Sequence, residues 1–132
     1  MPESSSKSRP RVRDYRDLVA WQFAVKLAVE CQRISRLLRT EEQRDLARQL
    51  RRAAFSISAN IAEGNGRFTR ADYLRHLSIA NGSLNEVETH LLLAVECGFV
   101  RANDARVARQ LAAQAGRLLT ALIRSLRASD HR

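Results

Sequence analysis

The sequence predicts an all-α protein, an antiparallel up-down bundle of four helices. Hydrophobic residues make up 45% of the 132 residues and aromatic residues only 5%. This balance favours packed helices, because strands are rich in β-branched and aromatic residues. Both prolines, Pro2 and Pro10, precede residue 11, so no proline interrupts a later helix. Four segments with helical apolar spacing follow, and a chain of this length accommodates one domain.

The first helix is predicted over residues 17–39. The chain before it, residues 1–16, has no apolar stretch of a signal peptide and is expected to be a disordered basic tail. The apolar residues of the helix step by four, three, four, three and four positions, which keeps them on one face; they are Ala20, Ala24, Leu27, Cys31, Ile34 and Leu38.

The second helix is predicted over residues 41–63. Thr40 and Gln43 have the spacing of a capping box, which satisfies free amide groups at the start of a helix. Gly64 is expected to take the left-handed conformation that ends the helix, and Asn65-Gly66 adds turn residues. The predicted core residues are Leu46, Leu50, Ala53, Ala54, Ile57 and Ile61.

The third helix is predicted over residues 70–97, with Thr69 as its cap and Gly98 as its left-handed terminal residue. Its apolar residues alternate steps of four and three, which is typical of a bundle seam; they are Tyr73, Leu77, Ala80, Leu84, Val87, Leu91 and Ala94.

The fourth helix is predicted over residues 104–128, capped by Asn103 and followed by a short tail, residues 129–132. Short connections between the helices favour antiparallel neighbours, and the bundle is expected to comprise residues 17–128. The predicted core residues of this helix are Val107, Leu111, Ala115, Leu118, Leu122 and Leu126.

Charge and cysteine content restrict the possible partners and the compartment. The net charge is +9, and only Lys7 and Lys26 of the 23 basic residues are lysines, which leaves 21 arginines. Such an excess favours anionic partners, above all nucleic acid. Cys31 and Cys97 lack CxxC spacing and are expected to be buried in a reducing, cytoplasmic environment. The longest aliphatic run, LLLAV, is too short to span a membrane.

Two long stretches of the sequence resemble one protein family. QLRRAAFSISANIAEGNGR (residues 49–67) and DYLRHLSIANGSLNEVETHL (residues 72–91) resemble the 23S rRNA-intervening-sequence proteins, and the similarity extends from about Asp17 to Leu126. The sequence departs from the family pattern in having SISAN where SIPAN is frequent, and it lacks a proline common before the second helix. Neither departure affects a charged position.

The resemblance implies an antiparallel four-helix bundle that assembles as a homopentameric ring. The chain is also similar to the accessory proteins of diversity-generating retroelements, which are basic and bind nucleic acid and a reverse transcriptase. No enzymatic activity is established for the family. Many members are encoded far from any rRNA insertion, so the family name by itself does not identify rRNA as the partner.

Arginines form two candidate nucleic-acid-binding stripes. At 100° per residue, five arginines of the fourth helix fall in a wedge roughly 80° wide opposite its predicted core. No acidic residue of that helix shares the wedge, which suits a run of phosphates; an ordinary solvated face is the alternative. Arginines of the second helix also point away from its core. The candidate residues are Arg106, Arg109, Arg117, Arg124 and Arg127, together with Arg44, Arg48 and Arg51.

A subunit interface is predicted on the outward side of the second helix. Phe55 lies there with the small residues Ala59 and Ala62, and a phenylalanine on a surface is expected to be covered. The alternative for Phe55 is a base-stacking platform among arginines.

Small polar residues crowd the middle of the third helix, where helix propensity disfavours them, and we expect them to allow close helix packing. They are Ser78, Asn81, Gly82, Ser83 and Asn85. The NIAEGNGR segment contributes Asn60, Glu63, Gly64 and Arg67, which we expect to specify fold or assembly rather than catalysis. Glu63 should have an arginine or backbone donors nearby.

No catalytic, metal-binding or cofactor-binding residues are predicted. His76 and His90 are 14 residues apart, about 21 Å along one helix, and no Cys/His cluster occurs. The GNG turn lacks the context of a nucleotide-binding loop. A metal-free HEPN-type ribonuclease would need Arg and His four to six residues apart. Arg70 with His76 and Arg124 with His131 meet that spacing, but so many arginines produce such pairs by chance.

The sequence therefore predicts a non-enzymatic homo-oligomer, a pentamer by the resemblance, that binds RNA or DNA mainly through phosphate contacts. Little base recognition is expected, because outward aromatic and amide side chains are scarce. The alternative is a scaffold or accessory subunit whose partner is another protein, such as a polymerase or a toxin-like enzyme.

Overall fold

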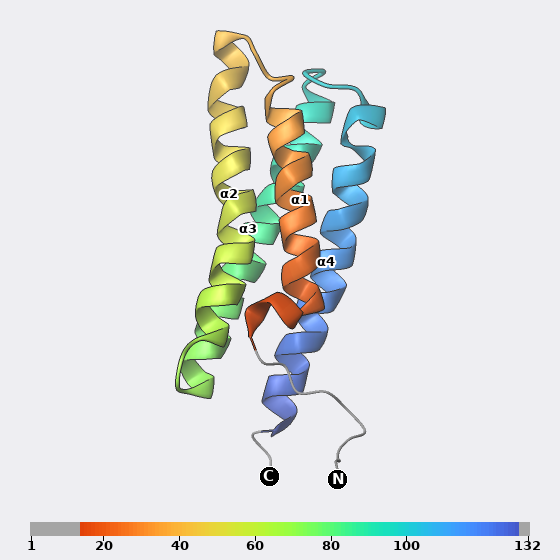
Figure 1. Cartoon of the computed structure of the whole chain (residues 1–132). Coiled ribbons are helices and arrows are strands. Elements are labelled where there is room, and N and C mark those ends of the chain that lie inside the picture. The colour runs from red at the N-terminus through yellow and green to blue at the C-terminus, as the bar shows by residue number, and fades with distance from the viewer. Residues whose placement is uncertain (1–13, 130–132) are drawn as a thin grey trace.

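The computed structural model describes residues 14–129 (Figure 1). These residues form a short 3₁₀ helix, η1, and four α-helices, with no strand in the described part of the chain. The predicted all-α class with four helices is confirmed. The bounds are Tyr15–Asp17 for η1, Val19–Ser35 for α1, Glu41–Asn65 for α2, Arg70–Glu96 for α3 and Ala102–Ala128 for α4.

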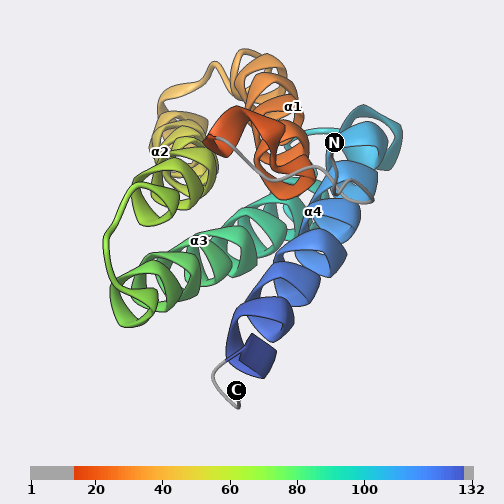
Figure 2. The same ribbon diagram turned by 60° about the horizontal axis from the view of Figure 1, so that its bottom comes forward.

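Each helix packs against two others. In the described chain α1 contacts α2 and α4, and α3 contacts the same two helices, whereas neither diagonal pair is in contact. The most extensive packing joins α2 to α3, and the least extensive joins α3 to α4. Figure 2 shows the ribbons of α3 and α4 diverging from the turn that joins them.

The buried faces of the first three helices are those that the spacing predicts. Every predicted core residue of the first helix is buried, including Leu38, which follows the end of α1. Burial of Cys31 raises the pKa of its thiol to about 12. In α2 and α3 the predicted residues are buried except Leu46 and Tyr73, which are half-buried against the core. The steps of three and four were therefore sufficient to identify these faces.

The buried face of α4 differs from the prediction. Val107 is 38% exposed, and the predicted leucines are only half-buried; Ala115 alone of the predicted set is buried. The core side is instead a row of small residues, because alanines let the helix backbone approach α1 and α3 closely. The leucines then cover the edge of the core. The buried residues of α4 are Ala105, Ala108, Ala112, Ala115 and Leu119.

Two of the three predicted helix caps are confirmed. Thr40 and Gln43 form the capping box of α2, and the Thr69 hydroxyl accepts a hydrogen bond of 3.1 Å from the Asp72 amide. The prediction of Asn103 as the cap of α4 was wrong. The helix begins at Ala102, and the amide of Arg101 donates to the Asp104 carboxylate at 3.0 Å. The acidic side chain supplies the acceptor from inside the first turn.

The glycine predictions were half right. Gly98 has a φ of 74°, as a left-handed residue after α3 should. The prediction that Gly64 takes a left-handed conformation and ends α2 was wrong, because α2 continues to Asn65 and the φ of Gly64 is not positive. The prediction that Cys97 is buried was also wrong, because Cys97 is exposed in the same turn as Gly98. The residue that caps the end of α2 is Gly66, which takes a right-handed conformation.

Ordered structure extends beyond the expected bundle at its start. Residues 14–16, which were assigned to the tail, instead precede and form η1, and the Tyr15 ring packs edge-on against Trp21 at 5.2 Å. The α1 helix ends at Ser35, four residues earlier than predicted. The rest of the predicted N-terminal tail and residues 130–132 lie outside the described residues. None of the described helices is long and apolar enough to cross a bilayer.

Candidate nucleic-acid interface

The arginines of α4 are exposed and lack acidic partners in the described chain. Arg106 donates to the Asn103 side chain at 3.3 Å and Arg117 donates to Gln114, both neutral groups one turn earlier. No ion pair joins any of the five predicted arginines of α4 to a described carboxylate. Their positive charges are therefore not neutralised locally, and they are available to an anionic ligand.

A surface groove lies between α3 and α4, and three of these arginines line it. At Gly116 the α4 backbone lies close to α3, since a Cβ there would be in ordinary contact with the Leu84 side chain at 3.4 Å. We call this surface groove the α3–α4 groove. Its lining residues are Asn81, Leu84, Asn85, Glu88, Thr89 and Leu92 from α3, and Arg109, Ala113, Gly116, Arg117, Thr120, Ala121 and Arg124 from α4.

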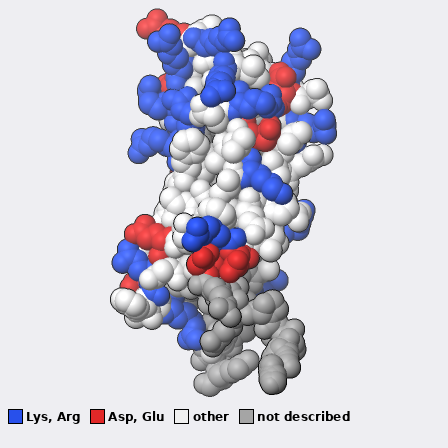
Figure 3. Space-filling model, in the orientation of Figure 1, with Lys and Arg blue, Asp and Glu red and all other residues white. Residues whose placement is uncertain are grey.

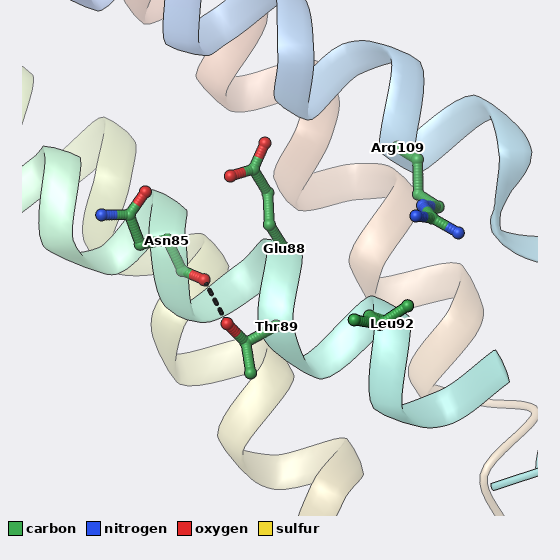
Figure 4. Close-up of a pocket in the computed structure, with 5 residues that line it drawn as sticks. All are labelled: Asn85, Glu88, Thr89, Leu92 and Arg109. Atoms are coloured by element: carbon green, nitrogen blue, oxygen red, sulfur yellow. Dashed lines mark hydrogen bonds between the residues drawn. The ribbon is translucent and has the colours of Figure 1, made fainter. Parts of the chain in front are cut away.

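The groove contains an acidic residue that the arginine stripe by itself did not indicate. Glu88 points from α3 toward α4, whereas Arg109 extends from α4 farther along the groove and does not point at Glu88 (Figure 4). The two side chains form no ion pair. On α4 the predicted wedge is free of acids, but the neighbouring helix supplies one. A pattern within one helix cannot show this, because it carries no information about which face of another helix lies opposite.

The arginines of α2 belong to a second basic surface at one end of the bundle. Figure 3 shows Lys and Arg side chains crowded at the upper end of the visible face, and a band with few charges across its middle. α1 ends and α2 begins at that end, and Arg33 of α1 donates to the Asp104 carbonyl of α4 at 2.8 Å. Arg44 and Arg51 have no described ion pair, whereas Arg48 pairs with Asp45 at 2.7 Å.

A hydrogen-bonded chain of polar residues joins the C-terminal half of α2 to α3. The Ser56 and Ser83 hydroxyls are 2.8 Å apart, and the Asn60 amide donates to the Ser56 hydroxyl at 3.0 Å. His76, which is 5% exposed, places Nδ1 3.0 Å from the Asn60 amide oxygen. Because that oxygen only accepts, Nδ1 carries the hydrogen and donates. We call these four residues the seam network.

The NIAEGNGR segment contributes Asn60 to the seam network, and its other predicted residues have separate contacts. Glu63 pairs with Arg67 at 2.7 Å, so the expected arginine is present, although the carboxylate is exposed rather than buried. Gly64 lies directly against His76. Of the small polar residues of α3, only Ser83 is at a helix crossing. Gly82 has open space beside it, so the expectation of close packing there was wrong.

The residues considered for catalysis do not form an exposed site. His76 is buried with its ring in the seam network, and Arg75 lies 3.4 Å from its other nitrogen. His131, the partner considered for Arg124, lies outside the described residues. Among the residues that the structure describes, no group of three or more His, Cys, Asp or Glu side chains could hold a metal ion.

Phe55 lies in an apolar surface patch between α1 and α2. Its side chain is 51% exposed, and Val29 of α1, in the same surface depression, is 64% exposed. We call this the α1–α2 apolar patch, made of Val25, Ala28, Val29, Phe55 and Ser58. Ala59 is exposed and Ala62 half-buried on the following turns of α2. Polar and charged residues of α1 and the turn after it line the same depression around the patch; they are Glu30, Gln32, Arg33 and Arg36.

Comparisons with known proteins agree with the fold. No curated protein matches the chain. A crystal structure of a protein with unknown function from the S23 ribosomal protein family of Bacteroides thetaiotaomicron is 25% identical, with a TM-score of 0.74. The match covers 80% of this chain and 98% of that chain. The family model described as 23S rRNA-intervening sequence protein matches residues 16–121. This chain therefore belongs to the 23S rRNA-intervening sequence protein family.

Proposed function

We propose that this protein is a non-enzymatic, homo-oligomeric four-helix bundle that binds nucleic acid in the cytoplasm through its exposed arginines. The observation that carries the proposal is the row of five α4 arginines with no carboxylate partner in the described chain. Guanidinium groups left without counter-charges at a surface suit phosphates. When they neutralise phosphates, counterions are released from the nucleic acid, and this release would dominate the affinity.

The proposed assembly is a ring, most simply the pentamer that the family resemblance implies, built from antiparallel up-down protomers. The α1–α2 apolar patch supports it, because exposed contiguous apolar surface marks a contact site. Repeating the protomer around a ring would multiply the basic surfaces. A long polyanion could then contact several protomers at once, which raises affinity without new contacts.

A protein-binding scaffold is the second candidate. The same apolar patch, edged by Arg33 and Arg36, would suit an amphipathic segment of another protein. A ribonuclease of the HEPN type is a third and weaker candidate. Burial of His76 in the seam network counts against it, since a general base must reach its substrate.

The test is fluorescence anisotropy with a structured RNA and with duplex DNA at about 50 and about 200 mM salt. Neutralising several phosphates should weaken binding roughly a hundredfold or more across that range. The variant Arg117→Glu/Arg124→Glu should keep its mass and helicity but lose at least about tenfold in affinity, since each basic contact contributes to the salt slope.

The control is Lys26→Glu, a charge reversal on the exposed side of α1. It should retain nearly wild-type affinity. If neither nucleic acid binds at low salt, the proposal is wrong and a protein partner should be sought. Wild-type binding by the double arginine variant would instead exclude the α4 arginines as the site.

A further inference from the structure

The α3–α4 groove carries three kinds of surface side by side. The α4 rim presents the guanidinium groups of Arg109, Arg117 and Arg124. Apolar atoms between the rims come from side chains such as Leu92 and Ala113. The α3 rim presents two amides, a hydroxyl and a carboxylate, which belong to Asn81, Asn85, Thr89 and Glu88.

These three surfaces match the three parts of a single strand of nucleic acid. Phosphates pair with guanidinium groups, base faces pack on apolar atoms, and base edges take hydrogen bonds from amides and carboxylates. Arg117 and Arg124 are seven residues apart, about 10.5 Å along α4. The arginine rim therefore follows the groove for the length of more than one nucleotide.

Glu88 decides which part of the strand lies on the α3 rim. A carboxylate repels phosphate, so the sugar-phosphate backbone of the strand would be disfavoured against α3. Base edges carry N–H donors that a carboxylate accepts. Glu88 has no ion-pair partner among the described residues, so its oxygens are available for such donors. Bases should therefore point to α3 and phosphates to α4.

A duplex does not fit this arrangement. Its base edges are recessed within grooves and its outer surface is phosphate. Glu88 lies in a groove of the protein, so a duplex on the rims would bring phosphate rather than base edges to it. Unpaired bases can be turned outward and can reach such a group, as is usual in recognition of single strands.

The paired donors of guanine suit Glu88 best. The Watson–Crick edge of guanine carries N1–H next to the N2 amino group, and one carboxylate can accept a hydrogen bond from each. Adenine, cytosine and uracil each offer one donor group on that edge. A bidentate pair typically contributes about 1–3 kcal/mol of discrimination, which is roughly fivefold or more in affinity.

We propose that the α3–α4 groove binds a single strand of RNA or DNA, with phosphates on the α4 arginines and an unpaired guanine on Glu88. The assignment rests on the proposed nucleic-acid-binding function and adds the ligand class and the orientation of the strand. It replaces the expectation of little base recognition, because packing brings Asn81, Asn85 and Glu88 of α3 beside the arginines of α4.

The experiment compares short oligouridine strands that differ at one central nucleotide. One strand carries guanosine and the other inosine, which keeps N1–H but lacks the N2 amino group. Wild-type protein should bind the guanosine strand about fivefold or more tightly than the inosine strand. Ribose and deoxyribose versions separate RNA from DNA, and the guanosine strand annealed to its complement should bind more weakly than the free strand.

The variant is Glu88→Gln, and its matched control is Glu86→Gln, an exposed acid on the same helix that lies on the α2 side. Glu88→Gln should abolish the preference for guanosine without lowering the affinity for the inosine strand. Glu86→Gln should keep the preference. Circular dichroism checks that both variants remain helical.

Equal affinity for guanosine and inosine strands, a preference that survives Glu88→Gln, or duplex binding as tight as single-strand binding would each overturn the assignment. Salt-dependent binding of plain oligouridine, lost in Arg117→Glu/Arg124→Glu, would in that case still support the proposed function. Absence of any binding at low salt would contradict both the proposed function and the assignment of the groove.

Discussion

At position 64 the absence of a side chain allows α2 and α3 to touch. A Cβ there would lie 2.8 Å from the Cβ of His76, closer than real Cβ contacts come, and 3.1 Å from a ring carbon of Tyr73, which is tighter than most such contacts. Neither neighbouring atom is at the free end of a flexible chain. Glycine is therefore required at this residue by packing, and not by the left-handed turn that its place before Asn65-Gly66 suggested.

Gly64→Ala should destabilise the protein although alanine is the better helix former. Helix propensity alone would add about 1 kcal/mol, but the forced separation of α2 and α3 should cost about 1–3 kcal/mol. The matched control is Gly82→Ala, where a Cβ meets no atom within 4 Å. Urea unfolding should show Gly82→Ala at least as stable as wild type and Gly64→Ala less stable. An equal gain in unfolding free energy for both variants would show that α3 moves away from α2 without cost.

At the scale of elements, the packing of α2 on α3 combines an apolar seam with a polar one. The seam network crosses this interface between buried leucine and isoleucine side chains, and each of its members has a hydrogen-bond partner. Polar groups inside a packed interface are costly in any register that separates them from their partners. The network therefore favours one alignment of the two helices.

Asn60→Ala should cost about 1–3 kcal/mol of unfolding free energy, because it leaves Nδ1 of His76 buried without an acceptor. The comparison is Asn81→Ala on α3, whose side chain is exposed. Its change should stay within about 0.5 kcal/mol. Chemical denaturation of both variants measures the difference. A neutral Asn60→Ala would mean that water or a local shift satisfies His76, and that the seam network does not set the alignment.

The whole molecule separates its surfaces by chemistry. Arginines gather at one bundle end and along the α3–α4 groove, while a band with few charges crosses the face in Figure 3. The α1–α2 apolar patch carries Phe55 and Val29 more than half exposed. A ring needs a contact surface that does not compete with the ligand surface, and this separation would allow both to be used at once.

Phe55→Glu should break the proposed ring into smaller species, because a charge buried in a subunit contact is costly. Multi-angle light scattering should then report a mass nearer the 14.9 kDa of one chain. Phe68→Glu is the control, since Phe68 is fully exposed in the turn between α2 and α3 and lies outside the patch. Its mass should match wild type. An unchanged mass for Phe55→Glu would exclude the patch as the contact.

The sequence by itself determined the all-α class, the four helices to within a few residues at most ends, and the buried faces of α1, α2 and α3. These properties depend on residues near one another in the chain: apolar steps of three and four, the caps at Thr40 and Thr69, and Gly98. It also identified the family, which the match over residues 16–121 confirms. Local periodicity is sufficient for such features because a helix is stabilised within its own segment.

Only the tertiary structure decided which face of α4 is buried, why position 64 is glycine, and what lies opposite the arginines. On α4 both the alanine row and the leucine row have helical spacing, and the choice depends on how closely α1 and α3 approach. The Gly64–His76 contact involves two helices, and so does the groove that Glu88 and Arg109 both line. Contacts of this kind depend on the rotation and alignment of one helix against another, and a pattern within one segment does not contain that information.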